Sequence, residues 1–242
     1  MAKNEPLYIQ YGTTRIPFQL QYSKRRTLGI SVSPDRRVII TAPQDSSREK
    51  VLEKLEARAG WISKQLRHFE RLDEKLPRRH PEYVSGETFY FLGRKYRLKV
   101  VVAKAESVER KGRYIWVNAL RKSDQKRIAA LLQSWYRQQA KEIFHERLRR
   151  HGHILRKEKL GLNQLLIRRL TKRWGSCTEK ENVLLNLSLV QAPVQCIDYV
   201  MVHEICHLKY LNHGPKFYRL QDRYMPDWEK WKKRLEEVPL MD

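Results

Sequence analysis

The segment His203-Glu204-Ile205-Cys206-His207 constrains the fold more than any other feature of this chain. Apolar residues surround it at helical spacing, and Pro193 stands where the first turn of a helix would begin. In an α-helix the two histidines are about 40° and one turn apart, so both imidazoles reach one metal ion. Glu204 can then reach a water molecule on that ion. This is the H-E-x-x-H arrangement of zinc hydrolases, here on a helix.

His213 is the expected third ligand. A catalytic zinc is held by three protein side chains and keeps a fourth position for water. The sequence Asn212-His213-Gly214-Pro215 ends the helix and lets the chain fold the imidazole back toward the motif. Three later carboxylates rank below it as ligands: Asp222, Asp227 and Glu229.

The expected chemistry follows from this ligand set. Zn²⁺ bound by His203, His207 and His213 would lower the pKa of its water toward ~7 and polarise a carbonyl group. Glu204 is the expected catalytic residue, because a general base at this place takes the proton of the water and later passes one to the leaving amine. The alternative is a helix with two surface histidines and an ordinary glutamate.

Residues 1–80 are predicted to form a β-rich region with one helix. Alternating apolar residues predict four strands, and Ser33-Pro34-Asp35 predicts a turn between the last two. The strands are expected at residues 7–11, 16–22, 28–32 and 38–41. A helix capped by Ser46 or Ser47 would follow and reach Phe69. Pro77 and Pro81 mark the boundary, although a surface loop in one continuous domain would look the same.

Residues 81–242 are predicted to carry the metal site. Strand-like sequence occupies residues 84–118, and an apolar stripe predicts a long helix over residues 123–150. Residues 162–190 have the pattern strand, loop, strand. The metal helix follows, then a shorter helix, and a last amphipathic helix contains Trp228, Trp231 and Leu235. No internal repeat is visible in the sequence.

The charge of the chain is strongly positive. Lys and Arg number 50 against 27 Asp and Glu, a formal net charge of +23, which attracts polyanions. This positive charge is concentrated in residues 121–180, which contain 17 Lys and Arg against five Asp and Glu. We expect salt-sensitive, non-specific nucleic-acid binding, because no base-reading motif is present. The alternative is a solvated basic helix face. The basic residues at its centre are Arg147, Arg149, Arg150, Arg156, Lys157 and Lys159.

Other features favour a cytoplasmic protein. Cys177, Cys196 and Cys206 are odd in number and form no C-x-x-C pair, which fits a reducing compartment. The N-terminus has no apolar signal-peptide core, and no apolar run of about 18 residues predicts a membrane span. No signal for an oligomeric state is present.

Several residues near the motif have alternative interpretations. Cys206 is expected to be a small packed residue, and Cys177 a residue of a tight turn instead of a metal ligand. Tyr199 and Tyr210 are candidate hydrogen-bond donors to the transition state, although packing is favoured for each. Trp174 is expected in the core. Arg173 and Ser176 either hold a loop against the metal helix or line the substrate cleft. A second histidine cluster is expected to be solvent-exposed: His145, His151 and His153.

A set of motifs between about residues 165 and 225 resembles the YgjP-like metallopeptidase family, which is related to the SprT-like and WLM zinc proteases. The resemblance is looser upstream. Ile205 and Cys206 stand where many relatives carry Leu and Ala, at positions that bind no metal. The matching residues are Arg173-Trp174-Gly175-Ser176-Cys177, Leu185-Asn186, Leu189, Ala192-Pro193, Asp198-Tyr199-Val200, His203-Glu204-Ile205-Cys206-His207, Asn212-His213 and Phe217.

The resemblance implies an α+β, zincin-like core, in which a small sheet packs on the metal helix and three histidines bind zinc. It also implies metal-dependent hydrolysis, and the related groups include proteases that act on DNA-attached proteins. We therefore predict a zinc metallopeptidase with an N-terminal β-rich extension. Two alternatives stay open: a basic nucleic-acid-binding module with a structural zinc, and a zinc hydrolase of non-protein substrates. Structural zinc sites usually have four ligands rich in cysteine, which argues against the first.

Overall fold

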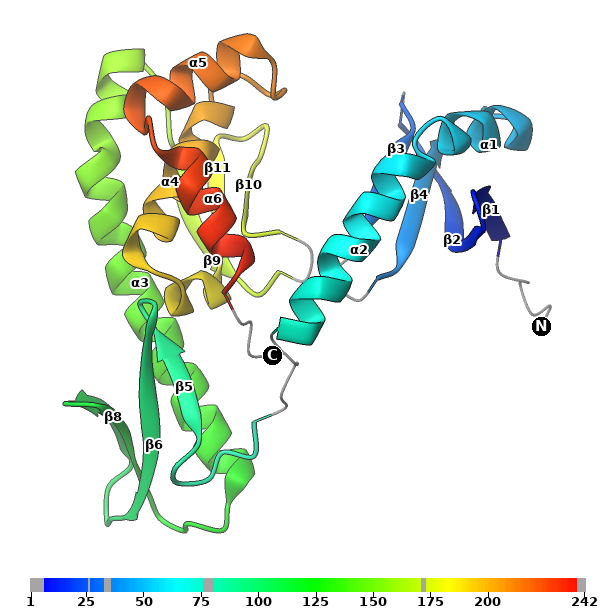
Figure 1. Ribbon diagram of the computed structural model, residues 1–242. Helices are drawn as coiled ribbons and strands as arrows, with labels where there is room; N and C mark the ends of the chain where they lie inside the picture. The colour runs from blue at the N-terminus through cyan, green and yellow to red at the C-terminus, as the bar shows by residue number, and fades with distance from the viewer. Residues whose placement is uncertain (1–6, 26, 33–35, 76–80, 171–172, 239–242) are drawn as a thin grey trace. The chain divides into compact units, whose positions relative to one another are not determined.

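The computed structural model describes residues 7–25, 27–32, 36–75, 81–170 and 173–238 (Figure 1). The chain divides into two compact units, Met1–Pro77 and Arg78–Asp242. The boundary expected from Pro77 and Pro81 remains a prediction, because residues 76–80 lie outside the described part. The mixed α+β class and the N-terminal strands are confirmed. No described helix has the length and apolar character needed to cross a membrane.

The first unit is a four-stranded sheet covered by two helices. Its strands have the order β1-β2-β4-β3, with β2 and β4 parallel and the two outer pairs antiparallel. Alternating apolar residues bury one face of the sheet against both helices. The turn predicted at Ser33-Pro34-Asp35 lies outside the described residues. The strands are β1 (Leu7–Tyr11), β2 (Thr14–Ser23), β3 (Gly29–Val32) and β4 (Val38–Pro43).

The prediction of one helix in this unit was wrong, because the structure has α1 (Arg48–Glu56) and α2 (Ala59–Lys75). Ser47 caps α1 by accepting a hydrogen bond from the Lys50 amide. The buried residues Val51, Leu55, Ala59 and Ile62 keep helical spacing across the break. Periodicity therefore could not reveal the interruption.

The second unit opens with a sheet of the same topology, β5-β6-β8-β7, followed by α3 (Gln125–Glu158). The two sheets match in register: Leu20 opposes Ile40 in the first, and Val100 opposes Val117 in the second. Each is followed by a capped helix. The repeat is not visible in the sequence, because the two sheets share little besides the alternation of buried residues. The strands are β5 (Thr88–Phe91), β6 (Arg94–Val102), β7 (Ser107–Lys111) and β8 (Tyr114–Ala119).

The rest of the second unit surrounds the metal helix α4 (Val194–His207). A three-stranded sheet of order β10-β11-β9 precedes it, with β10 at one edge. The second strand predicted within residues 162–190 ends at Asn186, whose side chain caps the 3-10 helix η1 (Leu187–Gln191). The other elements are β9 (Gln164–Arg168), β10 (Gly175–Cys177), β11 (Asn182–Asn186), α5 (Pro215–Tyr224) and α6 (Trp228–Glu236). α4 packs against α3, β10, β11, α5 and α6 and is the centre of the core.

Candidate metal centre

The metal helix is apolar on almost every side. Nine of its 14 residues are buried, because the helices α3, α5 and α6 and the sheet strands β10 and β11 enclose α4. The histidines of the motif lie one turn apart at its C-terminal end and are half-buried. His213 is exposed and lies just before α5, where Gly214 is the N-cap and Pro215 occupies the first turn. This turn returns the chain to the end of α4.

The three histidines meet at their Nε2 atoms. The Nε2 of His207 is 3.2 Å from that of His203 and 3.0 Å from that of His213, and the last two are 3.0 Å apart. Two imidazoles on a tetrahedral zinc, with Zn–N bonds of 2.0–2.1 Å, place their nitrogens about 3.3 Å apart. The arrangement thus fits a zinc ion. Within the described residues, this is the one group of His, Cys, Asp and Glu arranged to hold a metal.

The lower-ranked carboxylates have other partners. Asp222 accepts a hydrogen bond of 2.6 Å from the indole N–H of Trp228, and Asp227 accepts one of 2.6 Å from Trp231. Neither these two nor Glu229 belongs to the metal-binding group.

Hydrogen bonds on the opposite ring nitrogens orient two of the ligands. The Nδ1 of His203 lies 2.9 Å from Gln221 Oε1, and the Nδ1 of His207 lies 3.0 Å from the Tyr210 carbonyl. Both partners only accept, so each Nδ1 carries the proton and each Nε2 presents a lone pair. These two lone pairs, on nitrogens 3.2 Å apart, repel each other unless a cation or a proton lies between them. Sequence reasoning missed Gln221, which is fully buried in α5 and has no motif of its own.

Burial keeps the ligands in the form that binds metal. It lowers the pKa of His203 to about 4, although the hydrogen bond to Gln221 opposes this effect. Burial also lowers the pKa of His207 and of His213. All three imidazoles are therefore neutral at pH 7 and can coordinate a metal without first losing a proton.

Glu204 is buried beside the ligands, with only 5% of its surface exposed. Its Oε2 has no hydrogen-bond partner among the described residues. Burial raises the pKa of Glu204 to about 8, against the opposing charge of Arg173. Gly175 of β10 makes room for this side chain, because a Cβ atom at that position would lie 2.7 Å from Glu204 Oε1. A cation held by the nearby histidines would lower this pKa and favour the ionised carboxylate. The unpartnered Oε2 would then be available to a water molecule or a substrate.

Comparison with known proteins identifies the family. The model of the YgjP-like metallopeptidase domain matches residues 26–238, which is most of the chain and includes all four site residues. The chain belongs to the YgjP-like metallopeptidase family. The crystal structure of the metallopeptidase zymogen of Pyrococcus abyssi abylysin aligns with 41% of this chain and 99% of its own, at 18% identity and a TM-score of 0.36. No curated protein matches the chain.

Other residues of this YgjP-like site contribute indirectly. Arg173 is exposed, and its charge acts on Glu204. Cys177 is half-buried and lies outside the histidine group; burial and then the charge of Glu204 raise the pKa of its thiol. Tyr210 acts through its backbone carbonyl. The ring of Tyr199 stacks on Trp228 at a centroid distance of 6.2 Å.

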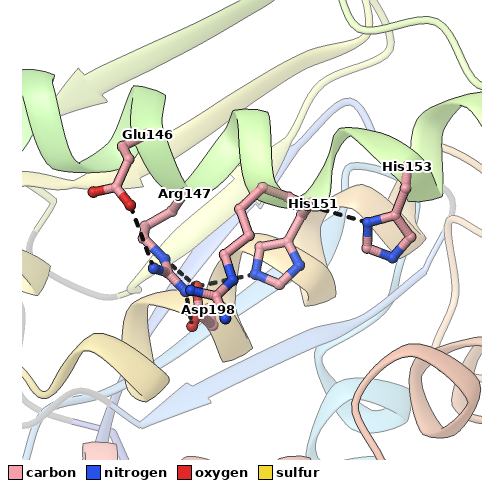
Figure 2. Close-up of polar contacts among 6 residues, drawn as sticks. Glu146, Arg147, His151, His153 and Asp198 are labelled. Atoms are coloured by element: carbon pink, nitrogen blue, oxygen red, sulfur yellow. Dashed lines mark hydrogen bonds and ion pairs between the residues drawn. The ribbon is translucent and has the colours of Figure 1, made fainter.

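A buried ion pair joins α4 to α3 in this family member (Figure 2). Asp198 accepts two hydrogen bonds of 2.6 Å from the guanidinium of Arg147 and lies 3.0 Å from His151 Nε2. The predicted exposure of His151 was wrong, because only 15% of its side-chain surface is accessible. Arg147 of the basic segment is buried as well, with 8% of its side-chain surface accessible. The third member of the predicted cluster, His153, is exposed, and His145 is half-buried. Asp198 is five residues before the candidate ligand His203, so the ion pair fixes α4 against α3 close to the histidine group.

Proposed function

We propose that this metallopeptidase hydrolyses peptide bonds with a zinc ion held by His203, His207 and His213 and with Glu204 as general base. The convergence of three imidazole Nε2 atoms within 3.2 Å of one another carries the proposal. Imidazole nitrogens in a tetrahedral arrangement suit zinc. When bound, zinc supplies Lewis acidity toward a carbonyl oxygen and acidifies a water molecule.

The chain's own residues supply the proton transfers and hold the ligands. Glu204 accepts the proton of the attacking water through Oε2, which has no hydrogen-bond partner among the described residues, and it returns a proton to the leaving amine. Gln221 and the Tyr210 carbonyl fix the rings of His203 and His207, so the ligand atoms stay directed at one point.

The edge strand β10 offers a place for an extended substrate. β10 pairs with β11 on one side, and on its other side no further strand of the sheet follows. An extended peptide can add to such an edge through main-chain hydrogen bonds. Because Gly175 of this strand touches Glu204, a peptide paired with β10 would lie next to the general base.

The basic surface supports a substrate associated with nucleic acid. Residues 149–159, at the C-terminal end of α3 and its C-cap, expose five of the cations predicted at the centre of the basic segment, whereas Arg147 is buried against Asp198. A positive face attracts a polyanion and whatever protein is bound to it. The five cations are Arg149, Arg150, Arg156, Lys157 and Lys159. We also propose a cytoplasmic location, which the free thiols of Cys177, Cys196 and Cys206 support.

The test combines metal analysis with hydrolysis of an unfolded protein. Full-length protein is expected to hold about one zinc per chain and to cleave casein. A chelator should stop cleavage, and added Zn²⁺ should restore it. Protein without a divalent metal, or cleavage that resists chelation, would contradict the proposal. Hydrolysis of ester or phosphodiester substrates without casein cleavage would favour the non-protein hydrolase, and zinc without any hydrolysis the structural-zinc module.

A further inference from the structure

The sheet β5-β6-β8-β7 has one buried and one open face. Its inner face packs on α3, and Figure 1 shows the sheet lying along that helix. Because side chains alternate along a strand, the intervening residues share the outer face. This outer face carries three aromatic rings, four cations and one carboxylate. They are Tyr90, Tyr114, Trp116, Lys95, Arg97, Lys99, Lys111 and Glu109.

Rings and cations are interleaved on this face. Trp116 and Tyr114 are neighbours on β8, with ring centroids 6.2 Å apart. The Lys99 ammonium lies 4.0 Å from the centroid of Trp116 and 5.8 Å from that of Tyr114. Lys95 lies 6.0 Å from the centroid of Tyr90.

The charges on this face are open to a partner. In the part of the chain that the structure describes, no ion pair joins any of the four cations to a carboxylate. Lys95, Arg97, Lys99 and Lys111 are all exposed, and Tyr114 is 43% exposed. The face therefore presents π-surfaces and positive charge together.

The N-terminal sheet shows that the fold does not require these groups. Its topology and register are the same, but Gln19 opposes Ile39 where Lys99 opposes Trp116. The equivalent outer face therefore has a neutral pair at its centre. The first sheet has one described cation–aromatic pair, Arg15 over Tyr8, on its β1-β2 edge, whereas the second sheet has a cluster of rings and cations around Trp116. That cluster needs an explanation other than stability of the architecture.

We propose that the outer face of β5-β6-β8-β7 binds single-stranded nucleic acid, with Trp116 and Tyr114 stacked on bases and the surrounding cations on phosphates. Unpaired bases expose the π-faces that aromatic side chains on a sheet can stack against, whereas a duplex keeps them stacked inside. The four cations neutralise the phosphate backbone. The site is separate from the metal ligands, so it does not depend on zinc or on hydrolysis.

Fluorescence anisotropy of the full-length protein with labelled oligo(dT) and oligo(U) of about 12 nucleotides tests the proposal. Trp116→Ala is expected to weaken binding about 5- to 100-fold, and Trp116→Phe to retain most of it. Lys99→Gln should reduce the magnitude of the slope of log K against log salt concentration by about 0.7, as expected for one lost phosphate contact. Glu204→Gln should bind like wild type, which separates this site from the proposed peptidase function.

The matched control is Tyr8→Ala in the N-terminal sheet, where Arg15 lies 4.6 Å from the Tyr8 ring. It removes an exposed aromatic residue with a cation partner and should leave binding unchanged. Thermal melting confirms that each variant is folded. The proposal is overturned by absence of binding at about 50 mM salt, by equal losses in Tyr8→Ala and Trp116→Ala, or by tighter binding of a duplex. A change from oligomer to monomer in Trp116→Ala without a change in binding would also overturn it, since a second copy would then cover this face.

Discussion

Gly175→Ala is expected to slow peptide hydrolysis by moving Glu204. The added methyl group would lie 2.7 Å from Oε1, 2.8 Å from Cγ and 3.0 Å from Cδ of Glu204. Restoring an ordinary contact requires a displacement of about 0.8 Å, since non-bonded atoms pack at roughly 3.5 Å. A misplacement of about 1 Å can cost 10²-fold in rate, so we expect a loss of about 10- to 100-fold. Overpacking adds a cost of about 1–3 kcal/mol in the free energy of unfolding.

The assay measures initial rates of casein cleavage per bound zinc, together with thermal unfolding. Zinc content should stay at the wild-type level, because the three atoms nearest to the new methyl group all belong to Glu204 and none to the imidazoles. Gly152→Ala is the control, since the nearest atom to its added Cβ is 3.6 Å away and the position is inside α3. It should preserve the rate and stabilise the protein by roughly 0.5–1 kcal/mol. A wild-type rate in folded, zinc-loaded Gly175→Ala would refute the assignment of Glu204.

Three further predictions concern the groups around the metal. His213→Ala removes a proposed zinc ligand and should lower zinc affinity by more than ~100-fold, as measured by chelator competition. A loss of ~100-fold is the upper range for residues that only hydrogen-bond to a ligand. Gln221→Leu should lower zinc affinity about 10- to 100-fold in the same assay, whereas Gln221→Glu keeps an acceptor for His203 and should retain most of it. Asp198→Asn removes the buried counter-charge of Arg147 and leaves only the exposed Glu146 at 3.6 Å, so it should cost about 3 kcal/mol in urea unfolding at pH 7. Burial raises the pKa of Asp198, but its basic hydrogen-bond partners hold the pKa below its usual value. The stabilisation by Asp198 is therefore present above about pH 4 and is lost at lower pH. Urea unfolding of the wild type above and below about pH 4 would show this loss.

The candidate ligands could be predicted because the information lies in a short segment. Helical geometry brings His203 and His207 together, and the Gly-Pro turn returns His213 to them. Gln221 could not be predicted, since it reaches His203 from 18 residues away through the packing of α5 on α4. Gly175 belongs to a recognisable motif, but its contact with Glu204 depends on how β10 packs against α4.

The strands and helices were predictable where one apolar pattern covered one element. Short β10 and edge strand β7 have too few buried residues to show a pattern. Helix α3 continues past the expected end at residue 150 to Glu158, because Ile154 extends the buried stripe beyond the arginine-rich stretch. Arg147 occupies that stripe as a buried charge, which a sequence pattern cannot distinguish from an exposed one until its partner Asp198 is placed.

The most direct test of the central claim compares wild type with Glu204→Gln for zinc content and casein cleavage. The substitution keeps the size of the side chain and removes its capacity to accept a proton as a base. Equal zinc, near one per chain, with cleavage by the wild type alone is the predicted result. Equal cleavage by both proteins would contradict the role of Glu204, and absence of zinc from the wild type would contradict the metal centre itself.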